Sequence, residues 1–378
     1  MNVPKIRFND FNDEWVEYIL QSESDVRDGT HDSPKYVDNG YPLITSKNLT
    51  DMGTLDFSNV SYLKQEDFDK INQRSKVDIG DILFGMIGTI GKPVRIDRDD
   101  FAIKNVALIK EKGLIKNDYL IHYLHTPSIN KQFANNQDGG TQKFIALDKI
   151  RKLKITMPSR KEQEKIVSMF NLLDKKIELQ SKKIEDLKLF KKGLIHQMKK
   201  SSNNWSEYKI SEIFKITRGV VIPKTDLLDN KTTEYQYPVY SSQTSNNGIL
   251  GYDTKYDFDG KYLTWTTDGA NAGKVFYRNG KFRCTNVCGV LYNDNNKYVD
   301  ELTAELLNYE TPKHVSYVGN PKLMNNVMGD IKIFLPDSYE SDRVSKILLV
   351  INNKVLLENE KLYKLSELKK GLMQNMFV

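Results

Sequence analysis

Hydrophobic positions recur with a helical period in two long stretches of the chain. Residues 153–198 and 331–376 align without a gap, 178 positions apart. In each, a short apolar run ends at a proline, Pro158 or Pro336, and a heptad pattern of apolar residues follows. The heptad region covers roughly 40 residues, which as an α-helix would be on the order of 60 Å long. The pattern predicts two long helices, each entered from a strand.

The apolar heptad positions are the same in both copies. A helix with one apolar stripe cannot bury that stripe alone, so we expect the copies to pack on each other as an intramolecular coiled coil. Pseudo-twofold symmetry would follow if the two helices pack antiparallel. Polar residues at Gln180, Lys191, Glu358 and Lys369 interrupt the pattern, either as register marks or as docking points. The predicted seam consists of Phe170, Leu173, Ile177, Ile184, Leu187, Leu194, Leu348, Ile351, Val355, Leu362, Leu365 and Leu372.

The segments before the two helices repeat a weaker series of features in one order. Each begins at a tryptophan, Trp15 or Trp205, and continues through short strands, small-residue loops, a short helix and a final polar loop. This mixture indicates an α/β fold, of the mixed α+β kind, with two similar globular domains. We therefore predict a domain at 1–157, a helix at 158–200, a domain at 201–335 and a helix at 336–378.

Several local elements can be placed within the two domains. Gly29 and Gly219 each lie beside an arginine or aspartate and mark loops where φ is positive or the backbone approaches another segment closely. The strands expected from paired features are 41–44, 80–83, 237–240 and 260–263. Helices are expected around 118–125 and 300–310, each closed by Thr-Pro.

Composition limits the class of protein. The chain has 378 residues, of which 39% are hydrophobic and 28% charged, and it has a net charge of +6. This length suits two domains plus the helices. No apolar run approaches the ~20 residues of a membrane span, and the N-terminus lacks the apolar core of a signal peptide, so we expect no membrane and a cytoplasmic location. The basic charge permits an acidic partner such as DNA.

Common catalytic signatures are not found in the sequence. The loop that ends in Gly91-Lys92 only resembles a phosphate loop, because its spacing is wrong and a proline follows. His122 and His125 have a spacing that can bind metal but lack a third ligand, and Cys284 and Cys288 lack a second ligand pair. We expect a non-catalytic chain without a metal site. The alternatives are a stand-alone DNA-modifying enzyme with an unrecognised motif and a structural coiled-coil interaction protein.

The order of these features resembles the specificity (S) subunit of type I restriction-modification systems. The resemblance rests on the Lys-Lys-Gly-Leu ends of both helices, the strand-proline entries, the two tryptophan starts, and the blocks at 28–34 and 80–83. The second half departs from it, since residues 218–223 replace the fuller Asp-Gly-Thr-His form.

The resemblance implies a division of labour between subunits. Each domain would be a target recognition domain for one half of a split site in double-stranded DNA. The two helices would form an antiparallel coiled coil that sets the spacing and docks two modification (methyltransferase) subunits. Those subunits would bind S-adenosylmethionine, and restriction (endonuclease and translocase) subunits would use ATP and Mg²⁺. The chain itself would bind no cofactor.

Polar loops at matching places in the two domains are the candidates for DNA contact. Lysine and arginine suit phosphates, whereas hydroxyl and amide side chains suit base edges, although the same residue types also form ordinary turns. The predicted phosphate contacts are Lys47, Lys92, Lys143, Arg218, Lys274 and Lys322. The predicted base or groove contacts are Ser46, Asn48, Thr89, Thr141, Gln142, Ser242, Gln243, Thr267, Asn271 and Asn320.

Overall fold

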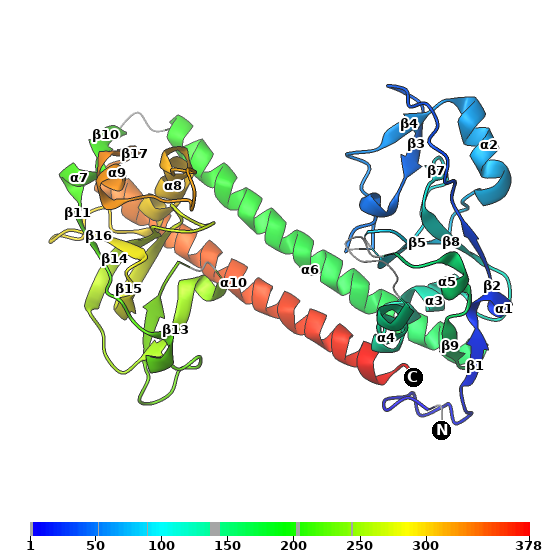
Figure 1. The fold of residues 1–378 in the computed structure, drawn as a ribbon. Coiled ribbons are helices and arrows are strands. Elements are labelled where there is room, and N and C mark those ends of the chain that lie inside the picture. Colours follow the sequence, from blue (N-terminus) through cyan, green and yellow to red (C-terminus); the bar gives the residue numbers. More distant parts are fainter. Residues whose placement is uncertain (1–2, 52, 89, 137–143, 202–204, 243–244) are drawn as a thin grey trace. The chain divides into compact units, whose positions relative to one another are not determined.

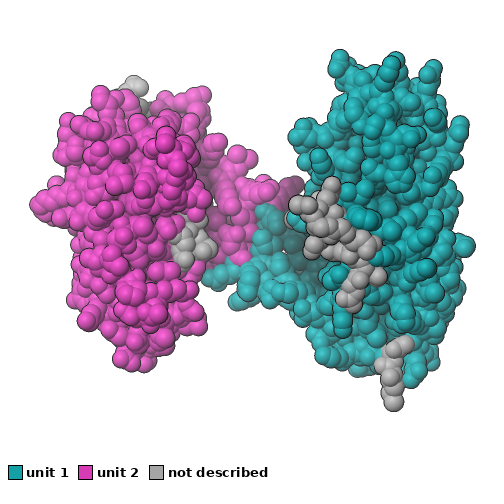
Figure 2. Space-filling model, in the orientation of Figure 1, with its two compact units in different colours: residues 1–181, 360–378 teal, residues 182–359 magenta. Residues whose placement is uncertain are grey.

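A computed structural model describes residues 3–51, 53–88, 90–136, 144–201, 205–242 and 245–378. The chain forms two compact units. Unit 1 consists of residues 1–181 and 360–378, and unit 2 of residues 182–359, as coloured in Figure 2. Each unit thus combines one globular part with a portion of both long helices.

The two long helices are α6 (Arg160–Ser201) and α10 (Ser338–Asn375), drawn green and orange to red in Figure 1. Each begins just after the proline that ends a strand, because proline has no backbone N–H to donate to the sheet. The side chain of Asp337 accepts a hydrogen bond from the Glu340 amide at 2.9 Å and so caps the start of α10. The prediction of two long helices is confirmed.

The helices run antiparallel within each unit. In unit 1, Ile166 and Phe170 near the start of α6 share a core with Leu372 and Met376 near the end of α10. In unit 2 the opposite ends meet, since Leu194 and Met198 pack with Val344 and Leu348. All twelve predicted seam residues are buried or half-buried, so the predicted coiled coil is confirmed.

Three of the polar residues that interrupt the seam, Lys191, Glu358 and Lys369, pair with the facing helix. Lys191 of α6 donates to the side-chain oxygen of Asn352 of α10 at 3.0 Å and to Glu305 of α8 (Glu301–Glu310) at 2.7 Å. Lys369 of α10 forms an ion pair with Asp174 of α6. The two arrangements match, because Lys191 and Lys369, like Asp174 and Asn352, are 178 positions apart.

Glu358 supplies a further pair of this kind. Its side chain is only 5% exposed, and it accepts a hydrogen bond from Lys183 of α6 at 2.8 Å. A buried carboxylate without its partner is strongly destabilising, so a shift of one helix along the other would be penalised. Of the two roles left open by the sequence, these contacts support register marks.

The globular parts share one strand arrangement. In unit 1 one sheet has the order β2-β8-β5-β6 and a smaller one the order β4-β3-β7. In unit 2 the order is β11-β16-β14-β15-β12-β13. The strands of unit 1 are β2 (Ser24–Asp28), β3 (Tyr41–Ile44), β4 (Ser61–Leu63), β5 (Ile82–Gly85), β6 (Gly91–Arg95), β7 (Ala102–Ile103) and β8 (Val106–Glu111). Those of unit 2 are β11 (Lys215–Arg218), β12 (Tyr237–Tyr240), β13 (Ile249–Asp253), β14 (Phe258–Thr266), β15 (Val275–Cys284) and β16 (Cys288–Tyr292).

One difference explains why unit 2 has a single sheet. Strand β15 is ten residues long and pairs with β14 antiparallel and with β12 parallel. In unit 1 the matching segment is divided into β6, which pairs with β5, and β7, which pairs with β3. The predicted strands at 41–44 and 237–240 coincide with β3 and β12, and β14 contains 260–263. The strand expected at 80–83 begins at Ile82 instead, because Gly80 has φ +95° in the preceding turn.

A short ladder joins each globular part to its long helix. Strand β1 (Val16–Ile19) pairs antiparallel with β9 (Lys154–Met157), and β10 (Ser206–Lys209) pairs in the same way with β17 (Lys332–Leu335). The strand that opens each half therefore lies beside the strand that leads into its helix.

The remaining helices are short. The predicted helices at 118–125 and 300–310 are α3 (Asn117–Tyr123) and α8, whose start is capped by Asp300 accepting from the Thr303 amide at 2.8 Å. The Thr-Pro pair after α3 also starts the next helix, because Pro127 is the first residue of α4 (Pro127–Asn136), a position that needs no backbone N–H. The others are α1 (Leu20–Glu23), α2 (Gln65–Ser75), α5 (Leu147–Arg151), α7 (Ile210–Ile213) and α9 (Asn325–Asp330), with 3₁₀ turns at Ser46–Asn48, Lys224–Asp226, Ser245–Gly248 and Thr311–His314.

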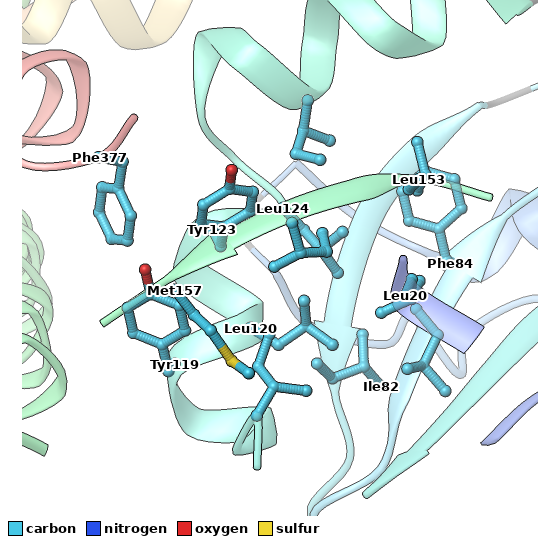
Figure 3. Close-up of a cluster of buried hydrophobic side chains, with 14 of the residues drawn as sticks. Leu20, Ile82, Phe84, Tyr119, Leu120, Tyr123, Leu124, Leu153, Met157 and Phe377 are labelled. Carbon is cyan, nitrogen blue, oxygen red and sulfur yellow. The ribbon is translucent and has the colours of Figure 1, made fainter. Parts of the chain in front are cut away.

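The end of the chain completes the core of unit 1. The Phe377 ring lies 5.6 Å from that of Tyr119, 5.8 Å from that of Tyr123 and 5.6 Å from that of Phe170, centroid to centroid. Figure 3 shows Phe377 facing the two tyrosines of α3. Among the described residues, no helix has the length and apolar character needed to cross a membrane.

Phe170 offers a test of this core. Phe170→Ala should lower the free energy of unfolding by about 3–5 kcal/mol, because a fully buried ring is removed and a cavity remains. Phe190→Ala, on the same helix at a position that is 60% exposed, is the matched control and should change it by less than about 0.5 kcal/mol. Urea unfolding followed by circular dichroism measures both; equal losses would contradict this packing.

The pairing of Asn352 with Lys191 gives a second test. Asn352→Asp copies the aspartate found at the matching position 174, yet it should destabilise the protein by about 1–3 kcal/mol. The reason is local: the Asn352 amide donates to Glu301 and to Glu305, and an aspartate there would face two carboxylates.

Changing the pH tests whether repulsion between carboxylates causes that loss of stability. The difference in unfolding midpoint between wild type and Asn352→Asp should shrink at about pH 4, where carboxylates begin to protonate. Asn353→Asp, at the adjacent exposed position, is the control and should have little effect. An equal loss in both variants at every pH would argue against the proposed repulsion.

Candidate nucleic-acid interface

The turn between β15 and β16 lies at the centre of a cluster of loops in unit 2. The Val220 amide donates to the carbonyl oxygen of Cys284 at 3.1 Å, and the Thr285 amide donates to that of Tyr240 at 2.9 Å. The Thr285 hydroxyl also hydrogen-bonds the Ser241 hydroxyl at 2.9 Å. The loops that follow β11 and β12 are therefore held against this turn.

The loop after β14 and the final polar loop adjoin the same turn. The Thr267 amide donates to the carbonyl of Val287 at 3.0 Å, and the carbonyl of Thr267 accepts from the Leu323 amide at 2.9 Å. The Gly269 amide donates to the carbonyl of Pro321, also at 2.9 Å. Segments that are separated by up to about a hundred residues in sequence thus form one surface.

Glycine is required where the backbones cross. A Cβ atom on Gly219 would lie 2.1 Å from the carbonyl oxygen of Cys284, and one on Gly29 would lie 2.4 Å from that of Ile103. Both distances are far shorter than van der Waals contact. The close backbone approach expected at these two glycines is present in both units.

The corresponding loops also meet in unit 1. The Lys104 amide donates to the carbonyl of Ile44, the last residue of β3, at 2.9 Å, and the Ile145 amide donates to that of Met86, just after β5, at 2.9 Å. A hollow of about 410 Å³ opens among these loops. Its lining includes Ser46, Lys47, Asn48, Ile87 and Asn105.

A charged network occupies the loop after β2. One ring nitrogen of His31 lies 2.8 Å from the Asp28 carboxylate and the other 2.7 Å from the side-chain oxygen of Asn105. Asp28 also pairs with Arg74 of α2. The hydrogen bond to Asp28, with that to Asn105, raises the pKa of His31. Both ring nitrogens face oxygen atoms, an arrangement that the protonated ring satisfies by donating twice.

A buried arginine supports the loop cluster of unit 2. The Arg278 guanidinium lies 3.6 Å from the centroid of the Tyr240 ring and 4.4 Å from that of Phe276, and its Nε donates to the Thr264 hydroxyl at 3.2 Å. Burial lowers the pKa of Arg278. The stacked cation fixes Tyr240, the residue at which the loop after β12 begins.

Comparison with known proteins identifies the family to which this architecture belongs. The family model described as type I restriction modification DNA specificity domain matches residues 30–189 and again residues 202–367. These two matches cover most of the chain. The chain belongs to the type I restriction-modification specificity family. The resemblance noted from the sequence is thereby confirmed.

Individual relatives agree with this assignment. A putative type I specificity subunit of Mycoplasma pneumoniae is 35% identical over 213 residues, which span 54% of this chain and 77% of the relative. Another putative type I specificity subunit of that organism is 42% identical over 142 residues, or 37% of this chain and 74% of the relative. The crystal structure of the type I S subunit from M. genitalium has the same fold, with a TM-score of 0.72, 17% identity, and coverage of 100% of this chain and 99% of that chain.

The hydrogen-bonded backbone of these loops is called here the loop frame. Three of the predicted contact residues of these specificity domains are buried in it. The Asn48 side chain uses all four of its hydrogen-bonding positions internally: its oxygen accepts from the amide and the hydroxyl of Thr45, and its nitrogen donates to the carbonyls of Asp56 and Asn59. The hydroxyl of Ser46 donates to the Asn105 carbonyl. Thr267 is also buried, and donates to Asp268. The structure gives these three side chains a role in holding the loops.

Three predicted phosphate contacts lie beside other groups of the specificity domains. Lys92 pairs with Asp51 at 3.0 Å, and Lys322 lies 3.8 Å from Asp268. The Lys274 ammonium lies 5.9 Å from the centroid of the Phe276 ring, and partial burial lowers the pKa of Lys274 although the residue retains exposed surface.

The other predicted contacts of the specificity domains divide into two groups. Lys47, Arg218, Asn271 and Asn320 are exposed and Ser242 is half-buried, all on the loops described above. Five predicted residues lie outside the described part of the chain, namely Thr89, Thr141, Gln142, Lys143 and Gln243.

One exposed polar side chain at the centre of the cluster was not among the predicted contacts. Asn286 is exposed at the tip of the turn from Thr285 to Cys288, whose ends are joined by a backbone hydrogen bond of 3.0 Å. Asparagine next to threonine is a common turn signal, so the sequence could have indicated this position. Of the two histidines considered as metal ligands, His122 is a packing residue: its ring lies 5.2 Å from that of Phe170, and burial lowers the pKa of His122 to about 4. His125 is exposed.

The His31 network predicts a pH effect on stability. Because the pKa of His31 is raised in the folded state, its contribution is fully present below the unfolded pKa and is lost as the pH rises through the folded pKa. The unfolding temperature of His31→Gln should therefore fall below that of wild type by more at about pH 5.5 than at about pH 8.5.

A histidine elsewhere controls for general pH effects. His314→Gln changes an exposed histidine for which no carboxylate partner is found among the described residues. Thermal unfolding of all three proteins at both pH values measures the difference. A gap between wild type and His31→Gln that grows with increasing pH would contradict the proposed network.

Proposed function

We propose that this chain is the DNA-recognition subunit of a type I restriction-modification complex, in which each globular part binds one half of a bipartite target. The observation that carries the proposal is the pair of loop clusters. Both have the same strand order and the same close approach at glycine, but they present different exposed side chains. Two copies of one frame with different surfaces suit a target whose halves differ in sequence.

The exposed loop residues suggest how recognition is divided. Lys47 in unit 1, with Arg218 and Lys322 in unit 2, would bind phosphates, which sets affinity and its dependence on salt. Asn271, Asn286 and Asn320 would meet base edges, since an asparagine can make a paired hydrogen bond with adenine in the major groove.

The coiled coil would serve as spacer and docking surface. Its polar pairs at Asp174–Lys369, Lys191–Asn352 and Lys183–Glu358 oppose sliding of one helix along the other, which would keep the distance between half-sites constant. Exposed apolar residues on the outer faces, such as Leu189 and Leu357, would contact modification subunits.

Catalysis would belong to partner subunits. In this proposal two modification subunits bind S-adenosylmethionine and methylate adenine, and restriction subunits use ATP and Mg²⁺ to cleave DNA. The chain itself supplies binding and spacing. Its action on chromosomal DNA would place it in the cytoplasm.

Exchange of one globular part tests the proposal. Residues 201–335 would be replaced by the corresponding region of a related S subunit, and the chain co-expressed with its own modification subunits. Single-molecule sequencing of methylated adenines should show a motif in which only one half has changed, because each unit has its own loop cluster.

The reciprocal exchange is the matched control. Replacing residues 1–157 should alter only the other half of the motif. A motif that changes in both halves, or in neither, would contradict the assignment of one half-site to each unit. Absence of any sequence-specific methylation with the unaltered chain would contradict the proposed function itself.

A further inference from the structure

Residues 316–322 of unit 2 form a small hairpin within the loop cluster, called here the 316–322 hairpin. The Ser316 amide donates to the Lys322 carbonyl at 2.9 Å, and the Lys322 amide donates back to Ser316 at 3.0 Å. Gly319, with φ +75°, allows the chain to reverse between them. The hairpin has a defined backbone.

The base of this hairpin is held firmly. Val315 and Leu323, the residues on either side, are both buried in the core of unit 2. The indole N–H of Trp265 donates to the carbonyl of Leu323 at 3.1 Å, and Lys322 forms a bridge with Asp268 of the neighbouring loop. The tip therefore projects from an ordered support.

The tip is unusually apolar for its exposure. Tyr317 is 68% exposed and Val318 is 92% exposed. Isolated apolar side chains on a surface are common and need no explanation. Two adjacent ones on an anchored hairpin, inside a cluster of otherwise polar loops, are better explained by a partner that covers them.

Charge identifies the chemistry of that partner. The charged side chains of segment 311–329 are Lys313, His314 and Lys322; Lys313 pairs with Glu310 at 2.7 Å and Lys322 lies 3.8 Å from Asp268. Both lysine side chains are still more than half exposed, so they could contact the phosphates of a polyanion. Its position beside Asn320 and Asn271, which could hydrogen-bond to base edges, favours DNA over a protein surface.

The width of the hairpin indicates which groove of DNA it can enter. Paired strands lie about 4.8 Å apart, and with their side chains they are too wide for the minor groove of about 6 Å but fit the major groove of about 12 Å. Valine cannot form a hydrogen bond, and the apolar group that bases present in the major groove is the thymine methyl.

We propose that the 316–322 hairpin enters the major groove of the half-site bound by unit 2 and that Val318 contacts a thymine methyl group there. Tyr317 packs beside it against the same strand. This inference rests on the proposed function, and it adds a specific requirement, namely that a thymine methyl group of this half-site contributes to binding.

Deoxyuridine substitution tests the contact directly, because it removes only the methyl group. The complete complex of the chain with its modification subunits would be titrated against a duplex carrying the motif found by methylome sequencing, and against duplexes with deoxyuridine at each thymine of the second half-site. Wild type should bind at least one deoxyuridine duplex about threefold to tenfold more weakly. Val318→Ser should bind the thymine and deoxyuridine duplexes equally, and Val318→Ile should restore the preference.

Val350→Ser, at an exposed position of α10, is the control and should keep the wild-type ratio even if assembly weakens. Two results would overturn the inference: a wild-type ratio in Val318→Ser with assembly intact, or loss of modification subunits from Val318→Ser with the ratio unchanged. The last would assign the tip to a protein partner. A complex that fails to distinguish the motif from a scrambled duplex would instead refute the proposed function.

Discussion

The structure depends on the burial of two apolar helix stripes against each other. Neither α6 nor α10 could hide its stripe alone, and each finds its partner in the other. The helix ends also complete the globular cores: Phe170 and Phe377 pack with the tyrosines of α3 in unit 1, and Met198 and Leu348 enter the core of unit 2. Loss of the helix pairing would therefore expose apolar surface in both globular parts.

A long apolar seam brings a problem of register, since neighbouring alignments of two heptad patterns bury similar areas. Polar residues within the seam distinguish between them. Lys191 meets Asn352, Lys369 meets Asp174 and Lys183 meets Glu358, and a shift of either helix would leave these groups unpaired in a poorly solvated interface. Some stability of an all-apolar seam is given up for a single alignment.

The loop clusters show how one frame tolerates two different surfaces. The frame is made of backbone hydrogen bonds around the turn before β8 or β16 and of glycines that permit close crossing. Such contacts do not depend on most side chains, so exposed positions such as Arg218, Asn271 and Val318 can change without disturbing the fold. This separation of frame from surface is what a family of DNA readers with different targets requires.

Much of the architecture could be predicted from the sequence, because a heptad period and an ungapped repeat record helix packing residue by residue. The seam positions from Phe170 to Leu372, the strands β3 and β12 and the helix α8 all follow from local patterns. Whether a loop side chain is free to contact a ligand or is bonded within the protein could not be predicted in this way. Asn48 and Asn320 are alike in sequence terms, yet one has all its hydrogen bonds made within the loop frame and the other is exposed. Asparagine, serine and threonine suit a turn equally well whether they bond inward or face solvent, and only the tertiary contacts decide between the two. The same holds for Val318, whose exposure depends on the hairpin that carries it and not on its neighbours in sequence.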